Sequence, residues 1–135
     1  CYCGRHNCIE RFISGTGFAG RFVERHHRSL SPRGIIMAAG QGDPQAQAHY
    51  DHFIQALARS VASLINVLDP DVIVVGGGLS NIDRLYLDLP QALTPYLFSD
   101  RCITPMVPAR YGDSSGVRGA AWLPSCVEGA TTWAI

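Results

Sequence analysis

Three cysteines stand within the first eight residues of the chain, at Cys1, Cys3 and Cys8. Thiolates spaced this closely, with Gly4 between them, can turn their sulfurs toward one point and bind a soft cation such as zinc. A structural zinc site has four ligands, and this cluster offers three. We therefore interpret the chain as part of a longer protein that supplies the fourth ligand. A disulfide and unliganded thiols remain the alternatives for the cluster.

Glu10 follows the last cysteine of the cluster by two residues. A carboxylate held beside a rigid metal loop can accept hydrogen bonds from sugar hydroxyls. The alternative is an exposed glutamate at the start of a helical turn. The neighbouring residues alone favour this second interpretation.

A second candidate site is the junction Gly76-Gly77-Gly78, which follows the β-branched run Val72 to Val75. Three glycines at the carboxyl end of a strand remove every side chain from that edge, so a ligand can approach the backbone. The junction has neither the spacing of a Walker loop nor the GxGxxG of a dinucleotide fold. Contact with a nucleotide and a tight turn without a ligand are equally compatible with it.

The composition is that of one globular domain with a core of its own: 135 residues, 47% of them hydrophobic. Eleven basic residues balance eleven acidic ones, which argues against nucleic acid or an anionic membrane surface as partner. No apolar run approaches the length of a membrane-spanning helix. Cys102 and Cys126 are isolated and are expected to act as small apolar residues, so the cysteine usage indicates a reducing cytosol.

Hydrophobic periodicity and capping residues predict an α/β order of elements. Asp43 is expected to cap a long helix from Pro44 to Leu68, with His49 and His52 on its surface. Val72 to Val75 is expected to form a strand covered on both faces. Ser80 is expected to cap the helix after the glycines. The predicted helices span about 18–27, 34–39, 44–68, 81–97 and 116–123, and the strands 72–75 and 103–108.

Several motifs together resemble those of the ROK family (repressors, unassigned reading frames and sugar kinases). The resemblance covers residues 1–124, and bacterial fructokinase is the most similar subgroup, with N-acetylglucosamine kinase nearly as similar. The first motif resembles the CxCGxxGCxE zinc signature of the family, with Asn7 where the family has glycine. The matching segments are Cys1 to Glu10, Phe12 to Ala19, Gln41-Gly42-Asp43, Leu68 to Ser80, and Gly112 to Ala121.

The resemblance implies the C-terminal domain of the actin-like (ribonuclease H-like) sugar-kinase fold, with a zinc-binding loop at its start. It makes Cys1, Cys3 and Cys8 zinc ligands, with a histidine upstream as the fourth, and places Glu10 against sugar hydroxyls. Gly76, Gly77 and Gly78 would lie against the adenosine of ATP. Asp113 and Gly116 fall in the closing motif, where we expect a structural role. Residues 125–135 do not resemble the family and are expected to be poorly ordered.

The function implied is that of an ATP- and Mg²⁺-dependent hexose kinase of the cytoplasm, with fructose as the first candidate substrate. N-acetylglucosamine, glucose and mannose kinases are the alternatives, as is a sugar-responsive repressor of the same family. By resemblance the catalytic aspartate and the first phosphate loop belong to an N-terminal domain, so these residues alone are expected to be inactive. A homodimer is expected for the whole protein. Asn7 is the least costly replacement if its position needs a left-handed backbone.

Overall fold

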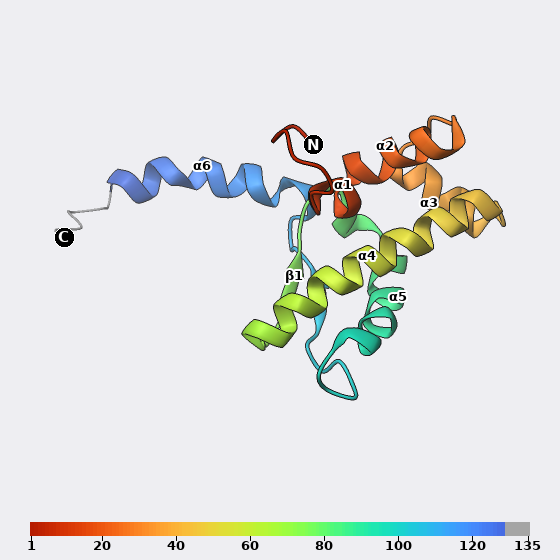
Figure 1. The fold of residues 1–135 in the computed structure, drawn as a ribbon. Helices are drawn as coiled ribbons and strands as arrows, with labels where there is room; N and C mark the ends of the chain where they lie inside the picture. Colours follow the sequence, from red (N-terminus) through yellow and green to blue (C-terminus); the bar gives the residue numbers. More distant parts are fainter. Residues whose placement is uncertain (129–135) are drawn as a thin grey trace.

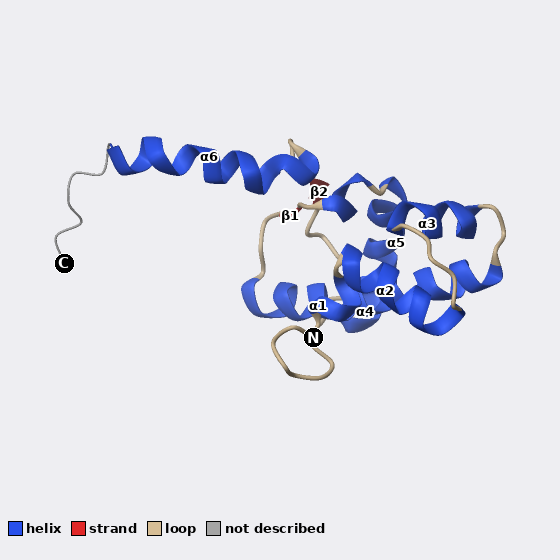
Figure 2. Ribbon diagram, turned by 90° about the horizontal axis from the view of Figure 1, so that it is seen from above, coloured by secondary structure: helices blue, strands red, loops and turns tan. Residues whose placement is uncertain are grey.

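The computed structural model describes residues 1–128, and their side chains as far as Trp122. Helices dominate, and two short strands form a small sheet (Figures 1 and 2). In chain order the elements are α1 (Glu10–Ile13), α2 (Gly15–His26), α3 (Pro32–Gly40), α4 (Pro44–Leu68), β1 (Ile73–Val75), the 3₁₀ turn η1 (Gly78–Asn81), α5 (Asp83–Leu93), η2 (Thr94–Tyr96), β2 (Met106–Pro108), η3 (Gly112–Ser114) and α6 (Ser115–Glu128).

Helix α4 is the centre of the structure, and its predicted bounds are confirmed. The carboxylate of Asp43 accepts hydrogen bonds from the backbone N–H groups of Gln45 and Ala46, and Pro44 occupies the first turn, where its missing N–H costs nothing. Helices α1, α2, α3 and α5 all pack against α4. The core is the apolar cluster Phe18, Phe22, Ile35, Ala39, Ala46, Tyr50, Phe53, Ile54, Ala58, Ala62, Leu85, Leu89 and Leu93.

The two strands are parallel, with Ile73 opposite Met106 and Val75 opposite Pro108. Helix α5 lies between them in the chain, as in a β–α–β unit, which confirms the predicted order of strand, helix and strand. The expectation that the first strand is covered on both faces is wrong. Ile73 and Val75 are half-buried, whereas Val74 points to the other face and is 59% exposed, because no described element covers that face.

The predicted cap of the helix after the glycines is also wrong. Gly78 to Asn81 form the 3₁₀ turn η1, and α5 begins only at Asp83, with Ile82 at its N-cap position. The hydroxyl of Ser80 instead donates to the carbonyl oxygen of Gly77 at 2.7 Å, which closes the turn on itself. A hydroxyl used within its own turn is not available to the helix that follows.

Helix α6 extends away from the rest of the chain in both views (Figures 1 and 2). It starts at Ser115 and continues to Glu128, beyond the predicted end at residue 123. Trp122 on this helix is 70% exposed. The segment 125–135, expected to be poorly ordered, begins inside α6, and residues 129–135 lie outside the described part of the chain. Among the described residues, no helix combines the length and the apolar character that crossing a membrane requires.

His49 is buried, at 3% exposure, which corrects the expectation of a surface residue. Its Nε2–H donates to the backbone carbonyl oxygen of Phe18 at 2.8 Å, and its ring packs on the rings of Phe18 and Phe22. Burial lowers the pKa of His49, and the nearby Arg21 and Arg25 act in the same direction, while the bond to Phe18 opposes them. The folded chain therefore holds His49 in its neutral form.

The chain is expected to lose stability in weak acid through His49. The unfolded chain binds the proton with a pKa near 6.5 and the folded chain with a lower one, so stability falls as pH drops from about 6.5 through the folded pKa. Urea unfolding followed by circular dichroism at pH 7, 6 and 5 measures this loss. His49→Gln should show a smaller loss, because glutamine keeps a donor for Phe18 but does not titrate.

His52→Gln is the matched control, because His52 lies on the exposed side of the same helix and bonds only to the carbonyl of Ala48. It should keep the pH dependence of the unchanged chain. An identical pH dependence in His49→Gln and in the unchanged chain would contradict the assignment.

Candidate functional site

The cysteine loop, residues 1–9, folds back on itself through two residues with a left-handed backbone. Gly4 has φ 76° and Asn7 has φ 57°. Because asparagine is among the few residues with a side chain that adopt this conformation at low cost, Asn7 can stand where the family signature has glycine. The loop turns Cys1, Cys3 and Cys8 inward, and their Sγ atoms all lie within 4.8 Å of one another.

The three sulfurs lie close enough together to be candidate ligands of one metal ion. Zinc–sulfur bonds of about 2.3 Å place two sulfurs on the same ion roughly 3.8 Å apart. The Sγ atoms of Cys3 and Cys8 are 3.3 Å apart, and the Cys1 Sγ lies within 4.8 Å of both. Within the described residues no other histidine, cysteine or carboxylate joins the group. The cluster thus offers three candidate ligands.

The two close thiols differ in acidity. The backbone N–H of Arg5 lowers the pKa of Cys3, and the hydrogen bond with the Cys8 thiol acts in the same direction. That bond, together with desolvation and the charge of Cys3, raises the pKa of Cys8. The shared hydrogen bond thus favours a single thiolate in this pair, and a thiolate is the form that binds a metal.

Glu10 is the first residue of α1, so the cysteine loop leads directly into the helix that carries this carboxylate. A hydrogen bond joins the loop to the first turn of this helix, because the N–H of Arg11 donates to the carbonyl oxygen of Cys8 at 3.0 Å. Glu10 is exposed and lines a hollow of about 330 Å³ together with Cys1, Ser14 and Thr16. The carboxylate is free to accept hydrogen bonds from a ligand in this hollow.

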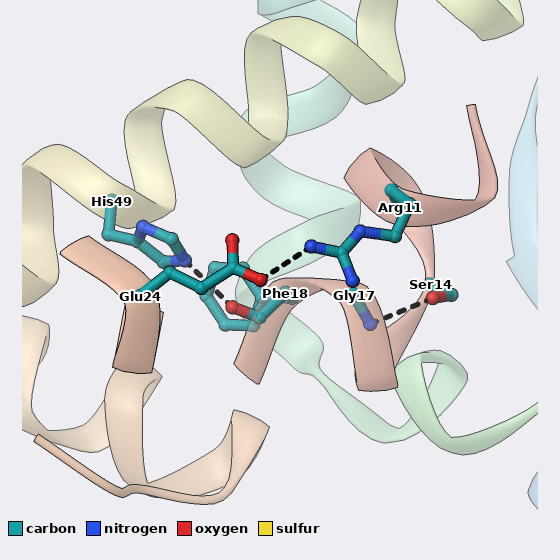
Figure 3. A network of polar contacts seen from close by, with 6 residues as sticks. All are labelled: Arg11, Ser14, Gly17, Phe18, Glu24 and His49. Carbon is teal, nitrogen blue, oxygen red and sulfur yellow. Dashed lines mark hydrogen bonds and ion pairs between the residues drawn. The ribbon is translucent and has the colours of Figure 1, made fainter. Parts of the chain in front are cut away.

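Two polar contacts tie α1 to α2 (Figure 3). Ser14, between the helices, accepts a hydrogen bond from the N–H of Gly17 and caps α2. The guanidinium of Arg11 pairs with the carboxylate of Glu24 at 2.6 Å. Figure 3 also shows the bond from His49 to Phe18, which fixes α2 on α4. Glu10 is thus connected to the core through α2.

The glycine turn presents bare backbone, as the sequence predicts. Gly76, Gly77 and Gly78 are exposed, and a Cβ atom placed on any of them would meet no atom within 4 Å. Gly77 has φ 75°, a conformation that a residue with a side chain adopts only with strain. The turn therefore needs glycine at its centre, and its backbone is uncovered where the side chains would stand.

The closing motif packs beside the glycine turn. Because β1 and β2 are parallel, the turns that follow them, η1 and η3, lie at the same edge of the sheet and in contact. Gly112 of η3 has φ 53°, and a Cβ there would lie 2.9 Å from the Oδ1 atom of Asn81 in η1. Asp113 is exposed at this edge and accepts a hydrogen bond from Ser114. Gly116 lies at the start of α6 with open space around it.

Leu79 of the glycine turn also approaches the start of α2, where a Cβ on Gly15 would lie 3.7 Å from the Leu79 side chain. The structure therefore places the start of α2, which follows Glu10 in the chain, next to the glycine turn. Sequence reasoning missed three residues that link these elements, namely Arg11, Glu24 and His49. The spacing of Ser14 and Gly17 was visible, but nothing in the sequence shows which neighbour each one contacts.

Comparison with known proteins places this arrangement in a family. Residues 1–126 match the ROK family. The N-acetyl-D-glucosamine kinase of Yersinia pseudotuberculosis is 42% identical over 123 residues, which are 91% of this chain and 40% of that protein. The kinase of the same name from Shigella boydii is 40% identical over 91% of this chain and 41% of its own length. The chain thus spans about two fifths of the length of these relatives.

Solved structures agree with this result. A ROK hexokinase from Thermus thermophilus superposes with a TM-score of 0.76 at 26% identity, over 96% of this chain and 44% of the hexokinase. A ROK family glucokinase from Streptomyces griseus, solved with glucose and AMPPNP, gives a TM-score of 0.74 at 24% identity, over 91% and 46% of the two chains. The fold is that of part of a ROK sugar kinase, and the chain belongs to the ROK family.

Proposed function

We propose that this chain forms the metal loop, one sugar contact and the adenosine-facing edge of an ATP-dependent sugar kinase. One observation carries the proposal: the parallel strands place two glycine-containing turns side by side at their carboxyl edge, next to the start of α2. This edge is where open α/β sheets bind their ligands. The names of the 42%- and 40%-identical relatives support a kinase.

The nucleotide would lie against the turn Gly76 to Gly78. A flat adenosine can approach this backbone because no side chain stands over it and none of the three positions is covered. The turn is held in place from behind, where Ser80 bonds to Gly77 and Gly112 fits against Asn81. Mg²⁺, which accompanies ATP in such transfers, would neutralise the phosphate charge.

The sugar would bind at Glu10, whose carboxylate accepts hydrogen bonds from hydroxyls in the adjoining hollow. Motif resemblance alone puts fructose first among the substrates. The relatives named above are N-acetyl-D-glucosamine kinases, and they favour N-acetylglucosamine as the first candidate. Fructose, glucose and mannose remain the competing sugars.

Zinc would be held by Cys1, Cys3 and Cys8, with the fourth ligand, a histidine by family resemblance, outside these residues. When bound, the ion supplies a cross-link and no reacting group. The chain's own residues do the rest: the Cys8 carbonyl fixes the amide of Arg11, and α1 presents Glu10 to the hollow. A metal bound there would thus help to hold Glu10 in one place.

By resemblance the aspartate that takes the proton of the sugar hydroxyl belongs to an N-terminal domain, together with the first phosphate loop. We propose that this domain is the principal partner of the chain, and that the whole protein is a homodimer. A sugar-responsive repressor of the same family is the second candidate, since a ROK transcriptional regulator shares the fold with a TM-score of 0.69 at 22% identity. Sugar binding without ATP turnover would distinguish it.

The kinase assignment is tested with a chimera in which residues 1–124 replace the corresponding part of the Yersinia kinase. The chimera should phosphorylate N-acetylglucosamine with ATP, and a coupled assay of ADP release compares it with fructose, glucose and mannose. Glu10→Gln should lower kcat/KM about 10- to 100-fold, because a hydrogen bond to a charged group contributes roughly 1.5–3 kcal/mol. The 135-residue chain alone should be inactive.

Asp71→Asn, which changes an exposed carboxylate at the other end of β1, should leave the activity of the chimera unchanged. Sugar phosphorylation by the 135-residue chain alone would disprove the proposal that catalysis requires the N-terminal domain. A folded chimera that turns over none of the four sugars would count against the kinase itself.

The glycine turn is tested with Gly77→Ala. A side chain at φ 75° strains the turn by about 1–2 kcal/mol, which should shift the backbone that faces the adenosine. In the chimera the KM for ATP should rise about tenfold and the KM for the sugar should stay the same. Gly40→Ala, at an open position outside the site, is the control. Equal effects on both KM values would argue against a specific nucleotide contact.

The metal loop is tested by zinc content. The chimera should retain about one zinc per chain after dialysis against a weak chelator, and Cys8→Ser should lose it because one of three thiolate ligands is removed. Cys102→Ser should keep its zinc, since Cys102 lies outside the cluster. Full zinc retention in Cys8→Ser, measured by atomic emission, would disprove the assignment of this cysteine.

A further inference from the structure

The contact between α1 and α2 leaves no room for a side chain at Gly17. Gly17 is buried in the first turn of α2, directly over the backbone of Arg11. A Cβ atom on Gly17 would lie 2.7 Å from the carbonyl carbon of Arg11, 2.9 Å from its Cα, and closer still to its oxygen. Real Cβ atoms do not approach backbone this closely, so any side chain here must push the two helices apart.

The other glycines of α2 carry no such constraint. A Cβ on Gly20 would meet no atom within 4 Å, and one on Gly15 would make ordinary contacts of 3.7 Å with Leu79 and Pro32. Gly17 also has no left-handed backbone that would require glycine for another reason. Its lack of a side chain therefore serves one purpose, the close approach to Arg11.

Arg11 connects this contact to the cysteine cluster and to Glu10. Its N–H is bonded to the carbonyl of Cys8, one of the three clustered cysteines. It directly follows Glu10 in the same helical turn. Its guanidinium reaches forward to Glu24 on α2, and Arg21 of α2 lies over the ring of Phe12 at 4.1 Å. A displacement of the Arg11 peptide would move the Cys8 backbone and the Glu10 backbone together.

We propose that Gly17 is a positioning residue that sets both the geometry of the cysteine site and the direction of Glu10. Its bare Cα lets α2 rest on the Arg11 peptide, and α2 is in turn fixed to α4 by the bond from His49 to Phe18 (Figure 3). The role toward Glu10 rests on the sugar-kinase function proposed above. The role toward the cysteines does not, and it can be measured on the chain by itself.

The first measurement is a Co²⁺ titration of the 135-residue chain, using the absorption bands of thiolate-bound cobalt. Gly17→Ala should weaken Co²⁺ binding about tenfold or more, as changes in the support of metal ligands do. Gly20→Ala adds the same methyl group three residues later, into open space, and should bind Co²⁺ within twofold of the unchanged chain.

Two further variants separate positioning from general stability. Leu89→Ala opens the core on α5, far from α1 in the chain, and should destabilise the fold while leaving the cobalt spectrum and affinity unchanged. Glu24→Gln removes only the exposed ion pair with Arg11, keeps the fold, and should weaken Co²⁺ binding by a smaller factor than Gly17→Ala. Equal loss of affinity in Leu89→Ala, or unchanged affinity in Gly17→Ala, would overturn the proposal.

The second measurement uses the kinase chimera. Gly17→Ala should raise the KM for the sugar about tenfold and leave the KM for ATP unchanged, because the glycine turn is a separate element. Gly20→Ala should alter neither value. If the unchanged chimera is inactive, the proposed function fails while the cobalt titration still decides the role of Gly17. If the chimera is active and Gly17→Ala affects neither KM nor cobalt binding, the positioning role alone is wrong.

Discussion

The hydrogen bond from His49 to the carbonyl of Phe18 is the constraint on which the arrangement of this chain depends. It joins the second turn of α4 to the first turn of α2 inside the core, where a lost partner is costly. The rings of Phe18 and Phe22 pack around it. Because α1 packs on both α2 and α4 and follows the cysteine loop, this buried contact helps to fix where the loop and Glu10 stand.

The two candidate sites have different supports. The cysteine loop has no strand or long helix of its own, so its geometry comes from two left-handed residues and from the contact of α1 with α2. The glycine turn is supported from behind by the parallel strands and by η3. The first site therefore depends on helix packing and, when a metal is bound, on the ion. The second depends on the backbone of a β–α–β unit.

Local signals in the sequence were enough to locate much of this structure. Asp43 and Pro44 mark the start of α4 unambiguously, because a capping carboxylate and a proline at the first position act within one turn. The left-handed backbone at Asn7 follows from the preferences of asparagine, and the open glycine turn follows from the absence of side chains. Each of these features is decided by residues close together in the chain.

The features that sequence reasoning missed depend on contacts between distant residues. Nothing near His49 reveals that its partner is a carbonyl 31 positions earlier, so a surface position was the natural expectation. Ser80 has the type and place of a helix cap, but the 3₁₀ turn takes its hydroxyl. Val74 is likewise exposed because of which elements surround the sheet. The β-branched sequence of the strand does not indicate those neighbours.

That exposed face has a consequence for how the chain behaves in solution. Val72 and Val74 are exposed at the sheet, which has two strands in the described part of the chain, and Leu64, Val67 and Leu68 are exposed on the last turns of α4. Apolar side chains next to open strand edges promote association between copies. Copies of the chain are therefore expected to associate through this end as their concentration rises.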